Sequence, residues 1–259
     1  MQISYYEDIM PRGPAGCVVD AARVSRADVF LILDASIMPQ SVPIEELISV
    51  HANSGAAMTI VANNVGDSPA HRSGMNAVGI YVCDRRVLQF IPASGYQDIK
   101  EMLIPRLYEA GEVVAVFETD ACVPRVKGAG SYLGANQLAI SRLIETDETP
   151  VCHERHGTAI VHDTADIEAG ARICGPVLIG ERSSVSKNAV IVGPVSIGAN
   201  CRVGEGSHVC RSILWDQVSV GSGAFVDQSI LMHSAGVAAE AQVTRRIQHR
   251  TRLARALRG

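Results

Sequence analysis

Seven cysteines are the first candidates for chemistry in this 259-residue sequence. No two of them form a CxxC pair; they are Cys17, Cys83, Cys122, Cys152, Cys174, Cys201 and Cys210. An odd number without paired spacing predicts neither a disulfide framework nor a thiolate metal site. Because the chain also opens without a signal peptide, we expect buried, reduced thiols in a cytoplasmic protein.

A carboxylate, Asp34, follows the continuous apolar run Val29–Leu33 and stands two residues before Ser36. Residues two apart on an extended chain share a face, so Asp34 is the candidate metal ligand at this strand end. One carboxylate makes a poor magnesium site. We therefore interpret Asp34 as the cap of the following loop.

The C-terminal residues 244–259 hold six arginines and no acidic residue. Since the whole chain has a net charge of −4, the other 243 residues carry about −10. This segregated charge has two interpretations. The segment is either a cap packed by Ile247, Leu253 and Leu257, or a docking segment for an acidic protein partner.

Composition excludes several classes of partner. The chain is 47% apolar but only 4% aromatic, so its core is built from Ala, Val, Ile and Leu. No apolar stretch is long enough to span a membrane. The net charge of −4 gives no basic field for nucleic acid or an anionic membrane. We expect neither a membrane nor a nucleic acid as partner.

The elements that must position these residues fall into two halves, and the second half is a repeat. Aliphatic residues recur there every six positions, with one-residue slips before Leu214 and Leu231: Val161, Ile167, Ile173, Ile179, Val185, Ile191, Ile197, Val203, Val209, Leu214, Val220, Val226, Leu231, Val237 and Val243. This period fits neither a helix nor an amphipathic strand. It predicts about five coils of a left-handed parallel β-helix, with three short strands to a coil. We expect this β-helix to hold a homo-oligomer together, because its strand edges and end coils need cover.

His162, His208 and His233 suggest a metal or catalytic site on such a helix. Their separations of 46 and 25 residues are not multiples of a coil of about 18 residues. They should therefore not share a level, and we interpret them as structural. Cys201 falls at a small inward position of the repeat and is interpreted as core.

The first half alternates apolar strands with helices, which predicts an open α/β sheet. Strands are expected at 29–33, 57–62, 77–82 and 113–117, and the first, being continuously apolar, is predicted to be parallel and buried on both faces. Helices are expected from Pro43 to Gly55, from the cap Asp98 to Gly111, and from Ser131 to Ile144.

The two halves together resemble the sugar-1-phosphate nucleotidyltransferases, in particular the mannose-1-phosphate guanylyltransferase type. The motifs that carry the resemblance are Tyr6-Glu7-Asp8, Pro11-Arg12-Gly13-Pro14-Ala15-Gly16, Phe30-Leu31-Ile32-Leu33, Asn76-Ala77-Val78-Gly79-Ile80-Tyr81, Asp98-Ile99 through Pro105, and Tyr132-Leu133-Gly134-Ala135-Asn136. The resemblance implies a nucleotide-base loop at Gly13, Ala15 and Gly16 and a sugar-facing amide at Asn76. It also implies a Rossmann-like α/β domain, truncated here because the chain begins past the family's Gly-rich phosphate loop.

The resemblance further implies two metal-binding aspartates, and neither is present. Ser36 and Arg125 stand at those positions, with Asp34 as the remaining metal candidate. The family's basic sugar-phosphate motif is reduced to the short stretch 63–72. A hydroxyl and a guanidinium cannot replace two carboxylates around a divalent ion. We therefore expect no catalytic residue, no bound metal and no other cofactor.

The resulting hypothesis is a nucleotidyltransferase-like pseudoenzyme that acts as a regulatory or scaffold subunit or as a sugar-nucleotide sensor. A catalytic paralogue or an acidic protein would be its partner. One alternative is an active nucleotidyltransferase with unusual metal ligation and Mg²⁺; another is a hexapeptide-repeat acyltransferase. The predicted domains are 1–150, 151–243 for the β-helix, and 244–259 for the Arg-rich tail.

Overall fold

The computed structural model describes residues 11–63, 77–120, 123–146 and 150–249. The chain divides into two compact units, Met1–Arg125 and Val126–Gly259. The first holds an α/β part and the second a parallel β-solenoid of about five turns, which confirms the predicted fold class. Helix α4 (Ala129–Glu145) groups with the solenoid, whereas the sequence analysis placed it in the first domain.

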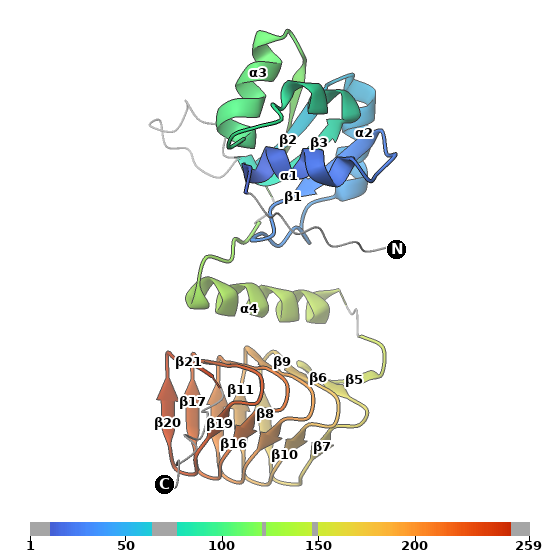
Figure 1. Cartoon of the computed structure of the whole chain (residues 1–259). Helices are drawn as coiled ribbons and strands as arrows, with labels where there is room; N and C mark the ends of the chain where they lie inside the picture. The colour runs from blue at the N-terminus through green and yellow to red at the C-terminus, as the bar shows by residue number, and fades with distance from the viewer. Residues whose placement is uncertain (1–10, 64–76, 121–122, 147–149, 250–259) are drawn as a thin grey trace, which may run out of the picture. The chain divides into compact units, whose positions relative to one another are not determined.

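The described part of the first unit is built on one mixed four-stranded sheet (Figure 1). Its strands lie in the order β1 (Val29–Leu33), β3 (Ala77–Asp84), β2 (Met58–Asn63) and β4 (Val114–Thr119). Strand β3 is antiparallel to both of its neighbours, and β2 is parallel to β4. Two clusters of apolar residues cover the two faces of this sheet.

The helical segments of this unit are α1 (Gly13–Ala22), α2 (Ile44–Ser54), the short turns η2 (Arg85–Phe90) and η3 (Ile99–Leu103), and α3 (Ile104–Glu109). Two helical segments of this unit were predicted from their sequence signals, whereas α1 and η2 were not. The Asp98 carboxylate accepts hydrogen bonds from the backbone N–H groups of Lys100 and Glu101, as predicted for a cap. Gly55 ends α2 with a φ of 64°. Within the described residues, no helix has both the length and the hydropathy needed to cross a membrane.

Strand β1 departs from its prediction. It pairs antiparallel with β3 at the edge of the sheet. Its residues alternate in burial, and Val29, Leu31 and Leu33 are 44%, 38% and 43% exposed. The continuous apolar run is therefore an antiparallel edge strand with one exposed face, and the prediction of a doubly buried parallel strand was wrong.

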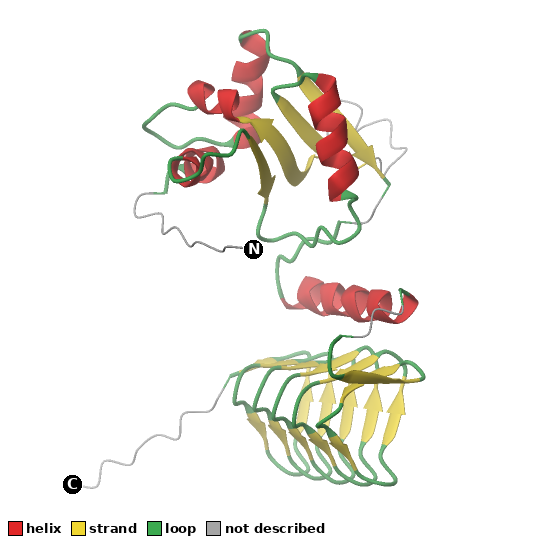
Figure 2. Cartoon of the chain, turned by 90° about the vertical axis from the view of Figure 1, so that its right-hand side faces the viewer, coloured by secondary structure: helices red, strands yellow, loops and turns green. Residues whose placement is uncertain are grey.

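The solenoid stacks its strands into three parallel sheets, seen side by side in Figure 2. One sheet holds β7 (Asp166–Ile167), β10 (Ser184–Val185), β13 (Arg202–Val203), β16 (Ser219–Val220) and β19 (Gly236–Val237). The second holds β8 (Arg172–Cys174), β11 (Val190–Val192), β14 (His208–Cys210), β17 (Phe225–Asp227) and β20 (Gln242–Thr244). The third holds β6 (Ala159–His162), β9 (Val177–Ile179), β12 (Val195–Ile197), β15 (Ile213–Leu214), β18 (Ile230–Leu231) and β21 (Ile247–Gln248), with β5 (His153–His156) antiparallel at its end.

All fifteen repeat positions lie in strands, and the one-residue slips have a single structural origin. Ile179 pairs with Ile197, eighteen residues on, whereas Ile197 pairs with Leu214, seventeen residues on. The missing residue comes each time from the corner between the second and third sheets. Arg211 and Gln228 turn that corner with φ values of 44° and 47°. A left-handed residue thus replaces the longer turn of the earlier coils.

The solenoid also continues past Val243, where the sequence analysis ended it. Strand β21 pairs in parallel with β18, so that Ile247 aligns with Ile230. The first residues of the predicted tail are therefore part of the last coil, with Ile247 half exposed. Leu253 and Leu257 lie outside the described residues.

Candidate functional site

Three polar side chains meet at one end of the α/β sheet. Two of them, Ser36 and Arg125, stand at the predicted metal positions, and the third is Asp34. Asp34 and Ser36 follow edge strand β1, and Arg125 follows β4 at the end of a loop. The backbone brings them together: Ile37 forms an isolated β-bridge with Arg125, and the N–H of Asp34 donates to the carbonyl of Gly79 at 2.9 Å. Positions 36 and 125, aligned from the sequence alone, are thus neighbours in space.

Arg125 occupies the centre of this cluster. Its Nη1 lies 2.5 Å from Asp34 Oδ2 and 3.0 Å from Ser36 Oγ. Its Nη2 donates to the carbonyl of Val78 at 3.1 Å. Asp34 Oδ1 accepts from both the backbone N–H and the hydroxyl of Ser36, at 2.9 and 2.8 Å. The Asp34–Ser36–Arg125 cluster therefore satisfies its own charge and hydrogen bonds.

Gly79 on β3 makes room for this arrangement. Its φ is 93°, and a Cβ there would lie 3.0 Å from both Arg125 Nη2 and Asp34 Cβ. Any side chain at this position would be strained and would press on the ion pair. The glycine of the Asn76–Tyr81 motif thus serves the packing of the cluster.

Electrostatics hold Asp34 ionised. Its pKa is lowered to about 2, first by the hydrogen bond from the Ser36 backbone N–H and further by the Ser36 hydroxyl and the Arg125 guanidinium, although partial burial opposes them. Burial raises the pKa of nearby Tyr81 to about 12, which keeps that phenol neutral. The charges of Asp34 and Arg125 thus balance each other without help from Tyr81.

The Mg²⁺ that the family resemblance implies does not fit these residues. A divalent ion prefers several oxygen ligands, and here one carboxylate already binds a guanidinium. Arg125, at the position where the resemblance implies a second aspartate, is a cation and binds Asp34 and Ser36. In the residues that the structure describes, no group of three or more His, Cys, Asp or Glu side chains is close enough to hold a metal ion.

The predicted base-binding residues pack against their own unit. Gly13, Ala15 and Gly16 form the first turns of α1, where Ala15 is buried and its N–H donates to the carbonyl of Gln97 at 3.0 Å. A Cβ on Gly13, whose φ is 79°, would lie 2.6 Å from that same carbonyl oxygen. The expected loop is therefore a helix start, and Gly13 has a packing role.

Arg12 fixes this helix to its surroundings. Its guanidinium forms an ion pair with Asp20 at 2.6 Å and donates to the carbonyl of Ala93 at 2.9 Å. The hydrogen bond from Arg12 lowers the pKa of Asp20. Gly16 leaves room for the arginine, because a Cβ there would lie 2.5 Å from Arg12 Cβ.

Other predicted residues lie elsewhere or outside the structure. Asn76, Tyr6–Asp8 and nearly all of 63–72 lie outside the described residues. Cys201 is buried in the solenoid interior, as interpreted from the repeat. His162, His208 and His233 lie on or after strands β6, β14 and β18, in different coils and two different sheets, so they form no common site.

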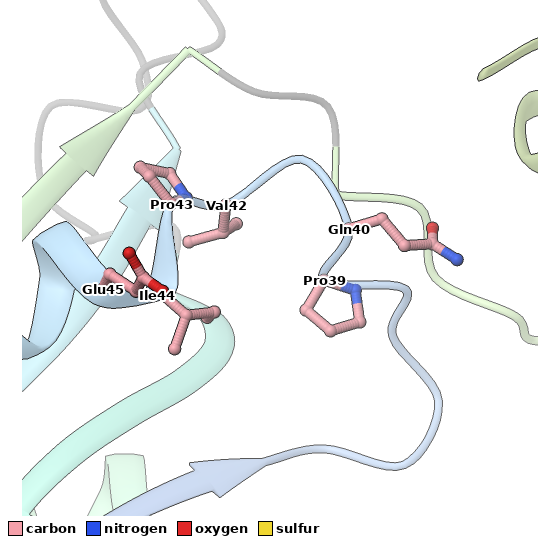
Figure 3. A pocket seen from close by; sticks show the side chains of 6 residues that line it. All are labelled: Pro39, Gln40, Val42, Pro43, Ile44 and Glu45. Atoms are coloured by element: carbon pink, nitrogen blue, oxygen red, sulfur yellow. The ribbon is translucent and has the colours of Figure 1, made fainter. Parts of the chain in front are cut away.

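An apolar pocket opens between β1 and α2, soon after Ser36 in the chain. Figure 3 shows its lining side chains, among them Pro39, Val42 and Ile44, around a volume of about 450 Å³. The sequence analysis did not single out this segment, since its residues carry no titratable pattern. The Asp34–Arg125 ion pair was also missed, although the sequence offered a signal for it: an aspartate two residues before one aligned position and an arginine at the other.

An α/β part followed by a parallel β-solenoid, with residues 36 and 125 in contact, is the arrangement that the resemblance to the nucleotidyltransferases implies. Comparison with known proteins agrees. Residues 173–251 match the family model described as "GMPPB C-terminal domain". The chain is 22% identical over 250 residues to a mannose-1-phosphate guanylyltransferase of Mycobacterium tuberculosis, covering 88% of this chain and 64% of that protein.

These matches confirm the resemblance to the sugar-1-phosphate nucleotidyltransferases that the motifs indicated. The chain is a distant relative of the guanylyltransferase and spans less than two thirds of its length. The matched family model covers coils of the solenoid from β8 onward, and the α/β part is included in the longer alignment.

Proposed function

We propose that this protein is a non-catalytic nucleotidyltransferase-like subunit that regulates or scaffolds a partner, or senses a sugar nucleotide. The observation that carries this proposal is the Arg125 guanidinium bound to Asp34 and Ser36. The Arg125 guanidinium is a fixed positive charge at a position where a nucleotidyl transfer enzyme would need a bound divalent metal ion.

The chemistry explains why this substitution matters. Transfer of a nucleotidyl group to a sugar phosphate brings together many phosphate charges, and a divalent ion neutralises and aligns them. A guanidinium at Arg125 repels such an ion and also consumes the one carboxylate, Asp34, that could ligate it. The side chains of Asp34 and Arg125 are partly exposed, so a bound anion could still reach them.

The active-enzyme alternative is favoured by the relative's name, since that protein is a mannose-1-phosphate guanylyltransferase. For this chain it requires that Asp34 leave Arg125 and turn to the metal. We therefore propose Mg²⁺ as a cofactor only for this alternative, and none for the non-catalytic subunit.

The two alternatives differ in pyrophosphate release. The full chain, mixed with nucleoside triphosphates and hexose 1-phosphates in Mg²⁺ or Mn²⁺, should release no pyrophosphate above a protein-free control. Turnover that is abolished in Asp34→Asn and retained in Asp28→Asn, a carboxylate on the loop before β1, would overturn the proposal and make Asp34 a metal ligand.

A gain-of-binding experiment tests the physical reason directly. The double variant Ser36→Asp/Arg125→Asp should bind Mn²⁺, detected as loss of the free-ion signal in electron paramagnetic resonance, whereas the wild type should not at this site. Arg26→Asp adds a carboxylate on an exposed loop of the same unit and is the control. Equal Mn²⁺ binding by wild type and double variant would contradict the role assigned to Arg125.

We also propose a homo-oligomer formed through the solenoid. The outer face of the second sheet exposes Val192 and Phe225, at 39% and 37%, and such apolar residues are typical of interfaces. Light scattering should show an oligomer that Phe225→Lys weakens and Ser219→Lys, on the neighbouring polar sheet, does not. A monomeric wild type would refute this part of the proposal. A catalytic paralogue or an acidic protein remains the proposed further partner.

A further inference from the structure

Another pocket, lined by polar and aromatic side chains, lies within the second unit between helix α4 and one corner of the solenoid. It has a volume of about 210 Å³. Its lining includes the polar and aromatic side chains of Tyr132, Asn136, Ser196, Trp215, Asp216 and His233. Tyr132 and Asn136 come from α4, which contacts strand β12. Ser196 lies in β12, Trp215 and Asp216 follow β15 in the next coil, and His233 follows β18 in the coil after that.

The solenoid register aligns the coil residues. Leu214 pairs with Leu231, so Asp216 and His233, each two residues further on, hold equivalent places in neighbouring coils. In the coil before them the place beside Trp215 belongs to Gly198, where a Cβ would lie 2.4 Å from Asp216 Oδ1. The glycine lets the Trp215–Asp216 corner approach closely. Asp216 Oδ1 accepts from the backbone N–H of Ala199 at 2.8 Å, which fixes the carboxylate.

The polar side chains that line this pocket have unused hydrogen-bonding capacity. In the described part of the chain, the side chains of Tyr132, Asn136, Trp215 and His233 make no hydrogen bond to another residue. Likewise, Asp216 Oδ2 accepts no hydrogen bond from any residue that the structure describes. Together these groups offer a phenol, an amide, an indole N–H, an imidazole and a carboxylate oxygen in one small space.

We propose that this pocket binds a single neutral hexose. A pyranose ring has an apolar C–H face that packs on aromatic rings such as Tyr132 and Trp215, and a rim of hydroxyls that each donate and accept. Asn136, Asp216 and His233 supply the matching polar partners. The volume equals roughly seven liquid waters of about 30 Å³ each, which suits one sugar ring.

Charge excludes the phosphorylated forms of the ligand. Asp216 is a carboxylate with no cationic partner among the described residues, so it would repel a sugar phosphate or a nucleotide. The ligand class is therefore the free hexose. This inference does not rest on the proposed function, because every lining residue belongs to the unit Val126–Gly259 and none to the Asp34–Ser36–Arg125 cluster.

Trp215 is the only tryptophan in the chain, so its fluorescence reports on this pocket alone. The full chain should be titrated separately with D-mannose, D-glucose, D-galactose and guanosine monophosphate. We expect a saturable fluorescence change with at least one hexose and none with the nucleotide. Asn136→Ala and Asp216→Asn should each weaken the binding about tenfold, the loss of one hydrogen bond to a ligand.

The matched control is Gln137→Ala, one residue along α4 on an exposed position outside the pocket. It should bind like the wild type. Asp216→Asn retains the oxygen that accepts from Ala199, so its fold is expected to be unchanged, and thermal unfolding checks this. No saturable change with any hexose, equal weakening by Gln137→Ala and Asn136→Ala, or a response to the nucleotide alone would overturn the proposal.

Discussion

The two polar clusters of this protein differ in how their hydrogen-bonding groups are used. In the α/β unit, Asp34, Ser36 and Arg125 bond to one another. In the solenoid unit, Trp215 and His233 face a pocket and make no side-chain hydrogen bond to any residue in the described ranges. The polar groups of the first cluster are used by one another, while those of the second are open to a ligand.

The difference follows from how each unit is built. A solenoid repeats one short coil, so its corners are fixed by neighbours about one coil away and single residues there can change without loss of the fold. The α/β cluster depends on a loop after β1, on Gly79 with its positive φ in β3, and on a segment after β4. Changing Arg125 there alters charge, backbone pairing and packing together.

The largest expected effect compares the two cores. Leu214→Ala in the solenoid and Leu47→Ala in α2 each remove a fully buried side chain. Each should lower the free energy of unfolding by about 2–5 kcal/mol in urea titrations. Hydrogen exchange should locate the loss from Leu214→Ala in the coils of β12, β15 and β18, since coils contact only their neighbours. Uniform loss of protection in every coil would contradict this picture of local stability.

The next effect distinguishes two glycines, one in each unit. Gly13→Ala should lower the free energy of unfolding by about 1–3 kcal/mol, because φ is positive and the new Cβ meets the carbonyl of Gln97. Gly134→Ala, inside α4 with no atom within 4 Å of the added Cβ, should raise it by up to about 1 kcal/mol. A Gly13→Ala variant that unfolds at or above the temperature of the wild type would show that Gly13 is not needed for the start of α1.

A smaller effect separates two arginine–aspartate ion pairs. Arg211 binds both oxygens of the nearly buried Asp227 at 2.7 and 2.8 Å, so Arg211→Gln should lower the free energy of unfolding by about 1–2 kcal/mol. Arg125→Gln should cost less than about 1 kcal/mol, because both partners are partly exposed. Arg172→Gln, on an exposed position of β8, should change stability little and is the control. A larger cost for Arg125→Gln than for Arg211→Gln would reverse this order.

The smallest effect concerns the titration of Asp34. Its pKa of about 2 lies below the ordinary value of 3.8, so its contribution to stability is complete above pH 3.8 and is lost as the pH falls toward 2. Arg125→Gln should raise this pKa, yet leave it below 3.8, because the Ser36 backbone N–H remains the largest cause of the shift. NMR titration of the carboxyl carbon measures both values. An unchanged pKa in the variant would show that Arg125 does not stabilise the carboxylate.

The repeat by itself determined the solenoid. Every repeat position from Val161 to Val243 lies in a strand, and the two slips before Leu214 and Leu231 mark real shortened coils. This was readable because each inward residue packs on residues about one coil away, so the pattern along the chain is the pattern in space. Motif spacing likewise identified positions 36 and 125 as neighbours.

Only the tertiary structure decided the rest, because it depends on contacts between segments far apart in the chain. The apolar run at Val29–Leu33 is compatible with an edge or a central strand, and the antiparallel order of the sheet placed it at the edge. Asp34 and Arg125 lie 91 residues apart, and their bond requires the close approach that Gly79 permits. Tyr132 and Asn136 belong to a motif assigned to the α/β half, yet packing of α4 against the solenoid brings them to Trp215. Contacts of this kind produce no periodic pattern in the sequence, because they depend on how separate helices and strands pack against one another.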